Sequence, residues 1–249
     1  MKLRVAVIYG GRSGEHEVSI RSARSIMDAM DPARYEVVEF FISKEGEWSP
    51  RPILPEPGAN PGIDVVFPIL HGTFGEDGTV QGLLELAGLP YVGAGVLASS
   101  VAMDKEVTKR LCIERGLPVV EYLVQFRGGL DPNAVERAFT YPVFVKPANL
   151  GSSVGISKAH HRGELEAALN LAAEYDRKVI VERSIEGQEI ECSVLGNDRP
   201  IAATPCEILP SREFYDYEAK YILDQTGFRT PADLASGELD EVRRLAVAC

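Results

Sequence analysis

The first 95 residues alternate between continuous apolar runs and segments with apolar residues at helical spacing. Continuous runs predict strands buried on both faces, and the spaced pattern predicts amphipathic helices. We predict three strands, over residues 3–9, 35–42 and 64–70, and two helices, over residues 19–30 and 79–87. Alternating strands and helices favour a parallel sheet covered by helices, so we predict an N-terminal parallel α/β domain. Residues 46–61, rich in Pro and Gly, predict a surface loop.

Strand patterns follow one another more closely after residue 96. Predicted helices cover residues 104–114, 131–138, 163–175 and 237–249, and predicted strands cover residues 119–125, 141–146, 154–157, 178–182, 189–195 and 201–208. This density of strands favours an antiparallel sheet. The predicted fold class is therefore a parallel α/β domain followed by an α+β region.

The composition limits the classes of partner. The chain has 249 residues, of which 45% are hydrophobic, and a formal net charge of −11. This charge offers no basic field to offset the repulsion of nucleic-acid phosphates, so we expect no nucleic-acid partner. No segment reaches the length of a transmembrane helix, and the first residues lack a signal-peptide pattern. We expect no membrane contact and a cytoplasmic protein.

The four cysteines do not form a metal-binding pattern. Cys112, Cys192, Cys206 and Cys249 include no CxxC pair and have no histidine at zinc-ligand spacing. We expect them to be reduced, buried small hydrophobic residues, and we assign no metal ligand.

A loop of small residues carries the strongest chemical signal. A predicted strand ends in Lys146, and the loop that follows contains Gly151, Ser152 and Ser153. Glycine and serine let backbone N–H groups approach an anion, and the lysine adds a positive charge beside them. The loop is suited to phosphate, although the lysine precedes the glycines, unlike in the Walker pattern. A plain hairpin with a solvated lysine is the alternative.

Two more loops follow predicted strands of the parallel sheet. Glu15 lies in the loop after the first strand, and His71 begins the loop after the third strand. The carboxyl ends of parallel strands are where an α/β sheet binds ligands. Glu15 can hold a cationic substrate group there, or it can simply stabilise the positive end of the next helix. The loop of His71 is polar and rich in glycine; a surface turn explains the glycines but not the histidine.

Two weaker sequence patterns point to the binding of an anion and of a nucleotide. Lys105 lies in the first turn of a predicted helix, where its positive charge is unfavourable beside the positive end of the helix dipole. An anion bound at that helix terminus would explain the lysine, and a solvated lysine is the alternative. Residues 179–189 form a strand, a turn and a strand. Backbone groups there can pair with an adenine edge, and Glu189 can accept ribose hydroxyls, but an ordinary hairpin has the same pattern.

Residues 213–221 are unusual for a loop because they hold three tyrosines, a phenylalanine, three acids and a lysine. A lid that excludes water during phosphoryl transfer is one interpretation. An edge strand or a partner-binding surface is the other.

Taken in order, these segments resemble the D-alanine–D-alanine ligases of the ATP-grasp superfamily over essentially the whole chain. The resemblance rests on five motifs: GGRSGEHEVS at 10–19, HG and GEDG within 71–78, MDK at 103–105, KP and GSSVG within 146–155, and YEAKY at 217–221. It implies three parts: an N-terminal α/β substrate-binding domain over 1–95, a small central ATP-grasp domain over 96–184, and an incomplete C-terminal ATP-grasp domain over 185–249 with a lid loop at 211–230.

The resemblance also implies a reaction. The γ-phosphoryl group of ATP is transferred to the carboxylate of one D-alanine, and the amine of a second D-alanine attacks the acyl phosphate. The product is the dipeptide D-alanyl-D-alanine used in peptidoglycan. The protein contributes mainly positioning and charge neutralisation. A homodimer is among the assemblies that the resemblance allows.

Residue roles follow from the resemblance alone. Glu15 would bind the ammonium of the first D-alanine, and His71 would line the same site. Ser152 and Tyr221 would connect to Glu15 by hydrogen bonds. The ATP-binding residues would be Lys105, Lys146, Gly151, Ser153, Glu182, Ser184, Ile185, Glu189 and Lys220.

The expected cofactors are ATP and Mg²⁺, but the family's Mg²⁺ ligands lie beyond the equivalent of Cys249. We therefore expect a ligase that is truncated at its C-terminus and carries no metal ligand of its own. The alternative is a catalytically defective fragment of such a ligase that still binds nucleotide. Another carboxylate–amine ligase of the superfamily is disfavoured by the EAKY sequence at 218–221.

Overall fold

The computed structural model describes residues 2–210, 213 and 226–249. The chain forms two compact units. The first contains residues up to Lys105 together with Asn149–Ser152, and the second contains Glu106–Ala148 and Ser153–Cys249. Our predicted domain boundaries, after residues 95 and 184, stay predictions.

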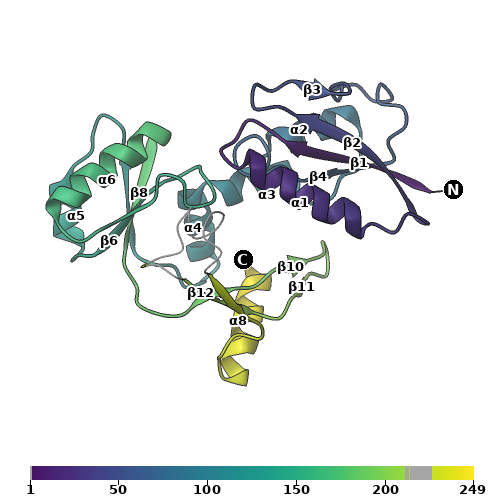
Figure 1. The fold of residues 1–249 in the computed structure, drawn as a ribbon. Coiled ribbons are helices and arrows are strands. Elements are labelled where there is room, and N and C mark those ends of the chain that lie inside the picture. Colours follow the sequence, from purple (N-terminus) through teal and green to yellow (C-terminus); the bar gives the residue numbers. More distant parts are fainter. Residues whose placement is uncertain (1, 211–212, 214–225) are drawn as a thin grey trace. The chain divides into compact units, whose positions relative to one another are not determined.

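The first unit is built on a four-stranded sheet in the order β3-β2-β1-β4 (Figure 1). Its strands are β1 (Leu3–Gly10), β2 (Tyr35–Ile42), β3 (Trp48–Ser49) and β4 (Val65–Pro68). β1 pairs in parallel with β2 and β4, which confirms the predicted parallel sheet, and β3 adds an antiparallel edge. β3 lies inside the predicted surface loop, because a two-residue strand is too short to show a sequence pattern.

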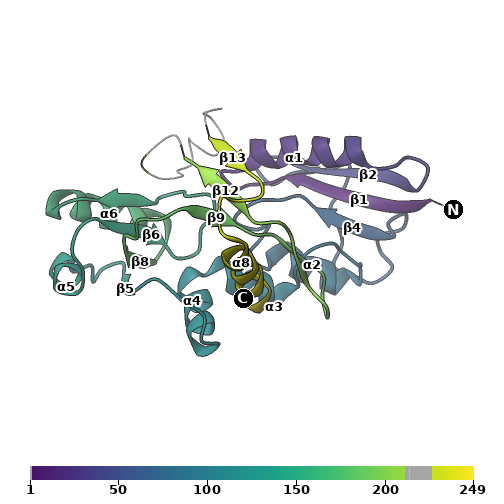
Figure 2. The same ribbon diagram turned by 90° about the horizontal axis from the view of Figure 1, so that it is seen from below.

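Helices cover both faces of this sheet. The first unit contains α1 (His16–Ala29), α2 (Thr79–Ala87) and α3 (Val96–Met103). Val5 and Val7 of β1 belong to the core cluster that includes α1, whereas Ala6 and Ile8 belong to the cluster that includes α2. Figure 2 shows α1 and α2 on opposite sides of β1. Burial on both faces explains the continuous apolar run of this strand.

The helix α3 was not predicted. Its only buried residue is Ser99, so no apolar face marks it in the sequence. β2 and α2 have the predicted bounds, and the other predicted elements of the first unit differ only at their ends; α1, for example, begins three residues before the predicted start at residue 19. In the second unit the predicted strands over 189–195 and 201–208 are each interrupted, after residues 191 and 202.

The second unit contains a four-stranded antiparallel sheet in the order β5-β8-β6-β7. The strands are β5 (Tyr122–Phe126), β6 (Val143–Pro147), β7 (Ser157–Ala159) and β8 (Lys178–Arg183), and the helices of this part are α4 (Lys105–Glu114), α5 (Pro132–Ala138) and α6 (Arg162–Tyr175). Leu165 and Leu169 of α6 pack against Val143, Val145 and Val181 in the core of this sheet. Figure 1 shows α6 lying along the sheet.

The predicted strand over 154–157 is wrong in its position. β7 starts at Ser157, because Ser152, Ser153 and Gly155 adopt left-handed backbone conformations with φ of 50°, 61° and 69°. A strand requires strongly negative φ, so the chain cannot enter the sheet before this loop ends.

Shorter elements complete the second unit. They are β9 (Glu189–Glu191), β10 (Val194–Leu195), β11 (Ile201–Ala202), β12 (Cys206–Leu209), β13 (Gly227–Arg229) and α8 (Ser236–Ala248). They form a three-stranded sheet, β13-β12-β9, and a β10-β11 pair, all antiparallel as predicted.

The cysteines differ in part from the prediction. All four are free, but Cys112, Cys192 and Cys206 are only half-buried and Cys249 is exposed. Cys112 and Cys249 lie on or beside helices, and Cys192 and Cys206 lie on or beside short strands, where the apolar pattern is weak. Among the described residues, no helix combines the length and the apolar character that crossing a membrane requires.

Candidate active site

A buried carboxylate lies at the carboxyl edge of the parallel sheet in the first unit. Glu15 immediately precedes α1 and is only 5% exposed. The hydroxyl of Ser152 donates a hydrogen bond to its carboxylate. Gly72 lies so close that a Cβ at this position would overlap the Glu15 carboxylate, and its φ is +67°. Glycine at 72 therefore lets the loop after the third predicted strand approach Glu15.

Ser13 joins the two loops that meet at this carboxylate. Its hydroxyl donates to the carbonyl oxygen of His71 at 2.7 Å and accepts from the backbone N–H of Glu15 at 3.2 Å. We did not predict a role for Ser13. A serine two residues before Glu15, in a glycine-rich turn, is the usual signal for this local hydrogen bond.

His71 is held between two side chains. Its Nδ1 lies 3.5 Å from Glu76 Oε1, and its Nε2 lies 3.3 Å from the Ser22 hydroxyl. The hydrogen bond with Glu76 raises the pKa of His71 above 6.5; burial opposes this, and the negative charge of Glu15 adds to it. These contacts therefore stabilise the protonated form of His71 relative to a free imidazole.

Glu76 is a second residue that sequence reasoning missed. Partial burial would raise its pKa, but hydrogen bonds from His71 and from the Gly72 N–H, at 2.7 Å, outweigh it and lower the pKa. Glu76 thus stays ionised and fixes both His71 and the Gly72 backbone. Its position five residues after His71 in the GEDG motif carried no signal by itself.

Lys105 and Gly151 lie with the same cluster in the first unit. The Lys105 ammonium donates to the carbonyl oxygen of Leu150. A Cβ on Gly151 would lie 3.6 Å from Glu15 Oε2, an ordinary van der Waals contact. The segment Asn149–Ser152 is thus attached to the first unit by Lys105 at one end and by Glu15 at the other.

A second charged cluster lies within the second unit. Phe144 and Lys146 of β6 pair with Glu182 and Ile180 of β8 in the antiparallel register. Lys146 Nζ lies 2.5 Å from Glu182 Oε2, and Lys109 Nζ lies 2.9 Å from Oε1. Burial would raise the pKa of Glu182, but the charges of both lysines outweigh it and lower the pKa. The cluster therefore leaves a net positive charge on the sheet surface.

Lys109 was not predicted as part of this cluster. It lies four residues after Lys105 on α4, so the two lysines share one helix face. That spacing was visible in the sequence, but its meaning depends on the packing of α4 near β8.

A pocket of about 630 Å³ in the second unit collects several predicted ATP contacts. Lys146, Ser153, Ile185 and Glu189 line it, together with Phe144, Ile156, Lys158, Gly187, Gln188, Glu207, Ile208, Leu209, Pro210 and Glu213. The Nζ atoms of Lys146 and Lys158 lie 5.4 Å and 5.6 Å from the centroid of the Phe144 ring. The pocket thus combines apolar walls with two ammonium groups and three carboxylates, and Glu213 pairs with Lys158 at 2.8 Å.

Comparison with known families supplies the decisive observation. Residues 4–60 and 54–94 match the family described as D-ala D-ala ligase N-terminus, and residues 111–249 match D-ala D-ala ligase C-terminus. The chain belongs to the D-alanine–D-alanine ligase family.

Individual members of the family cover the whole chain. A D-alanine--D-alanine ligase of Solibacter usitatus is 67% identical over 100% of this chain and 77% of its own length. One of Natranaerobius thermophilus is 47% identical over 94% of this chain and 74% of its own length.

Solved structures agree. The VanG D-Ala:D-Ser ligase from Enterococcus faecalis has a TM-score of 0.86 at 33% identity, covering 100% of this chain and 82% of its own. The D-alanine-D-alanine ligase from Coxiella burnetii has a TM-score of 0.84 at 34% identity, and the match covers 99% of this chain and 76% of the Coxiella chain. The ATP-grasp fold of these ligases is therefore confirmed.

One predicted residue, Ser184, lies in neither cluster, and two others are not described by the structure. Ser184 does not line the 630 Å³ pocket, and its backbone N–H donates to the Pro142 carbonyl at 3.4 Å. Lys220 and Tyr221 lie outside the described residues. Their assigned roles stay predictions.

Proposed function

We propose that the chain ligates two D-alanine molecules into D-alanyl-D-alanine with ATP, for peptidoglycan synthesis. Membership of the ligase family supports the reaction. The observation that carries the residue assignment is the buried Glu15 carboxylate, held by Ser152 beside His71 with its raised pKa. A carboxylate and a histidine whose pKa is raised complement the ammonium and carboxylate of a free amino acid.

In this proposal each unit binds one reactant. Glu15 of the first unit pairs with the ammonium of the first D-alanine, and His71 attracts its carboxylate. The pocket of the second unit holds ATP: Lys146 and Ser153 face the phosphates, and Ile185 and Glu189 face the adenine and ribose. Glu182 holds the Lys146 ammonium in place through their ion pair.

The proposed reaction has two steps. A carboxylate oxygen of D-alanine attacks the γ-phosphorus, the bond to the β-phosphate oxygen breaks, and ADP leaves. The deprotonated amine of the second D-alanine then attacks the acyl carbon. Phosphate leaves with the bonding electron pair and takes up the proton that the amine nitrogen loses, so that the neutral peptide bond remains. Charge neutralisation by Lys146 lowers the activation free energy of the phosphoryl transfer.

In this proposal Mg²⁺ binds together with ATP. Among the described residues, no three His, Cys, Asp or Glu side chains gather into a group that could hold a metal ion. No step above uses a metal, and we assign no ligand to one. We propose that activity nevertheless requires Mg²⁺, as the family does, which removal by a chelator and restoration with Mg²⁺ would test.

The reaction is tested by measuring phosphate release from ATP with D-alanine, L-alanine or D-serine, with mass spectrometry of the product. We expect release only with D-alanine, and D-alanyl-D-alanine as product. Because VanG is a D-Ala:D-Ser ligase, D-serine is the competing second substrate. Equal stimulation by L-alanine, or nucleotide binding without turnover, would overturn the proposal.

Glu15→Gln and Glu17→Gln form a matched pair for the residue assignment. Glu17 lies on the same helix but is exposed and pairs with Lys44 at 2.9 Å. We expect E15Q to raise the KM for D-alanine strongly and E17Q to leave it unchanged.

We also propose a cytoplasmic homodimer, on the basis of the family alone. Light scattering of the purified chain at several concentrations would measure its mass, and a monomer at all of them would contradict the dimer.

A further inference from the structure

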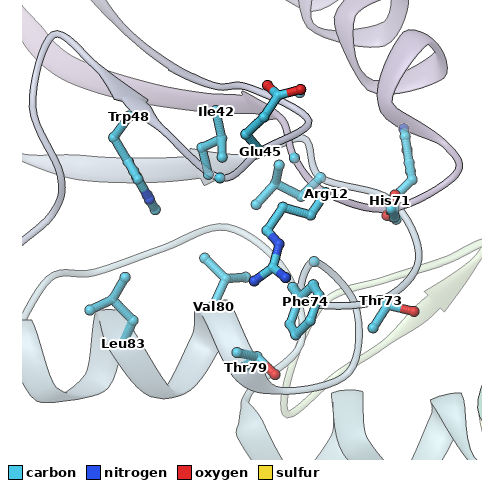
Figure 3. A pocket seen from close by; sticks show the side chains of 16 residues that line it. Arg12, Ile42, Glu45, Trp48, His71, Thr73, Phe74, Thr79, Val80 and Leu83 are labelled. Carbon is cyan, nitrogen blue, oxygen red and sulfur yellow. The ribbon is translucent and has the colours of Figure 1, made fainter.

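The first unit contains another cavity, of about 280 Å³ (Figure 3), which shares His71 with the proposed D-alanine site but whose apolar walls take no part in the proposed reaction. Its apolar walls come from separate elements: Ile42 at the end of β2, Trp48 in β3, Leu70 and Phe74 in the loop between β4 and α2, and Val80 and Leu83 in α2. The volume is close to the lower limit of small-molecule sites, about 300 Å³. The cavity therefore suits a small ligand with one apolar group.

Arg12 brings a positive charge to this cavity. Figure 3 shows its side chain extending between Val80 and Phe74. Its guanidinium carbon lies 5.0 Å from the centroid of the Phe74 ring. Among the described residues, none forms an ion pair or a hydrogen bond with this guanidinium. Stacking on an aromatic ring leaves the N–H groups at the guanidinium edge free for a planar anion.

The stem of Arg12 is held in place as well. Gly46 has a φ of +94°, and a Cβ there would lie 2.9 Å from the Cδ of Arg12. The loop backbone thus covers one side of the Arg12 stem, and Phe74 lies against its guanidinium. An arginine fixed on two sides loses less conformational entropy when it binds a carboxylate.

Two other charged groups line the cavity. Glu45 lies at its rim, and Figure 3 shows its carboxylate pointing away from Arg12. A hydrogen bond with Ser43 lowers the pKa of Glu45, so it is ionised at neutral pH. Its charge repels dianions such as phosphate monoesters more than monoanions. The side chain of His71 lies at the edge of the view and extends away from Arg12.

We propose that this cavity binds a small amphipathic monocarboxylic acid. Its apolar group lies among Trp48, Val80 and Leu83, and its carboxylate pairs with the Arg12 guanidinium. Free D-alanine does not fit this description, because it carries an ammonium group and only one methyl. The site is therefore distinct from the one at Glu15.

The chain carries its own reporter for this site, because Trp48 is its single tryptophan. The full chain is titrated with 3-phenylpropanoate and with 3-phenylpropanamide, its uncharged counterpart, while Trp fluorescence is followed. We expect a saturable change with the acid and binding at least 10-fold weaker with the amide, because only the acid can form the charged pair.

Three variants test the assigned contacts. R12M keeps an apolar stem beside Phe74 and should weaken binding of the acid at least 10-fold. E45Q removes the negative charge at the rim and should strengthen binding about two- to threefold. R24M, an exposed position on α1 that does not line the cavity, should bind like the unmodified chain. Thermal midpoints confirm that each variant is folded.

Several outcomes would overturn the inference. These are no saturable change with the acid, equal binding of acid and amide, or undiminished binding by folded R12M. Strict competition between D-alanine and the acid would show that the cavity belongs to the amino-acid site. Because the readout is binding, the result does not depend on whether the ligase reaction occurs.

Discussion

The hydroxyl of Ser152 donates a hydrogen bond to the carboxylate of Glu15, which lies 137 residues earlier in the chain. This contact helps to orient a carboxylate that is buried. Ser152→Ala removes this hydrogen bond and should therefore raise the KM for D-alanine about 10-fold, since hydrogen bonds to charged groups contribute about 1.5–3 kcal/mol. The KM for ATP should stay the same. Ser25→Ala, an exposed position on α1, is the control, and equal KM values for both variants would contradict the assigned role.

Gly72→Ala should disturb Glu15 from the opposite side. The methyl group would overlap the Glu15 carboxylate, and the left-handed backbone adds strain of about 1–2 kcal/mol. Gly58→Ala is the matched control, because Gly58 also has a positive φ of +81° but a Cβ added there would meet nothing within 4 Å. Both variants should lose stability in urea unfolding, and only G72A should also lose affinity for D-alanine. An equal effect of both on D-alanine would attribute the loss to strain alone.

Glu76→Gln should lower the pKa of His71. In the unmodified chain the hydrogen bond with Glu76 raises that pKa above 6.5, and burial opposes it; without the carboxylate, burial acts with less opposition. An NMR titration of the His71 ring would show the shift. A His71 pKa that is unchanged in E76Q would assign the perturbation to Glu15 instead.

The same pair predicts a pH dependence of stability. A raised His71 pKa contributes stability that is complete below pH 6.5 and is lost as the pH rises through the folded-state pKa. A lowered Glu76 pKa contributes stability that is complete above pH 4.5 and is lost as the pH falls through its folded-state pKa. The free energy of unfolding should therefore differ most between E76Q and the unmodified chain at pH 4.5–6.5.

Lys109→Met should destabilise the second unit. Glu182 is 5% exposed, and after this change a single lysine would compensate its buried charge. We expect a loss of about 1–3 kcal/mol, less than the 3–5 kcal/mol typical when a sole partner is removed. Urea unfolding of K109M, E182Q and the double variant would measure it. If the two single effects simply add in the double variant, the ion pair does not explain the loss.

The carboxylic acid proposed for the 280 Å³ cavity should also affect D-alanine. Ser13 lines that cavity and bonds to both the Glu15 N–H and the His71 carbonyl. If the acid changes the affinity for D-alanine, D-alanine must change the affinity for the acid by the same factor. Titrations of each ligand at saturating levels of the other would measure both factors, and unequal factors would rule out simple two-site linkage.

Local patterns predicted the elements whose apolar residues form a clear run or stripe. β2 and α2 match their predicted bounds, because a dense apolar run marks the strand and a helical apolar stripe marks the helix. β1 was predicted as a buried strand from its continuous apolar run, which exists because both faces of the strand are covered. α3 and β7 were missed or misplaced, since a helix without an apolar face and a loop with left-handed serines leave no periodic signal.

The residues of the candidate site also fall into two groups, those that the sequence predicted and those that it did not. Glu15, His71 and Lys146 were recognisable because each follows or ends a strand next to small residues. Ser13, Glu76 and Lys109 were missed, because their importance arises from hydrogen bonds and ion pairs that exist only once the loops and helices have packed. The roles of Lys220 and Tyr221 concern residues outside those that the structure describes.

Because β1 is buried on both faces, the first unit should unfold cooperatively. A central strand covered on both faces exchanges its amide hydrogens only through global opening, whereas edges and loops open locally. The loop that carries Arg12 and Glu15 starts from the end of this strand, so its anchor should persist until the whole unit unfolds. Heating should consequently abolish amino-acid binding and the native fold in one step rather than in two.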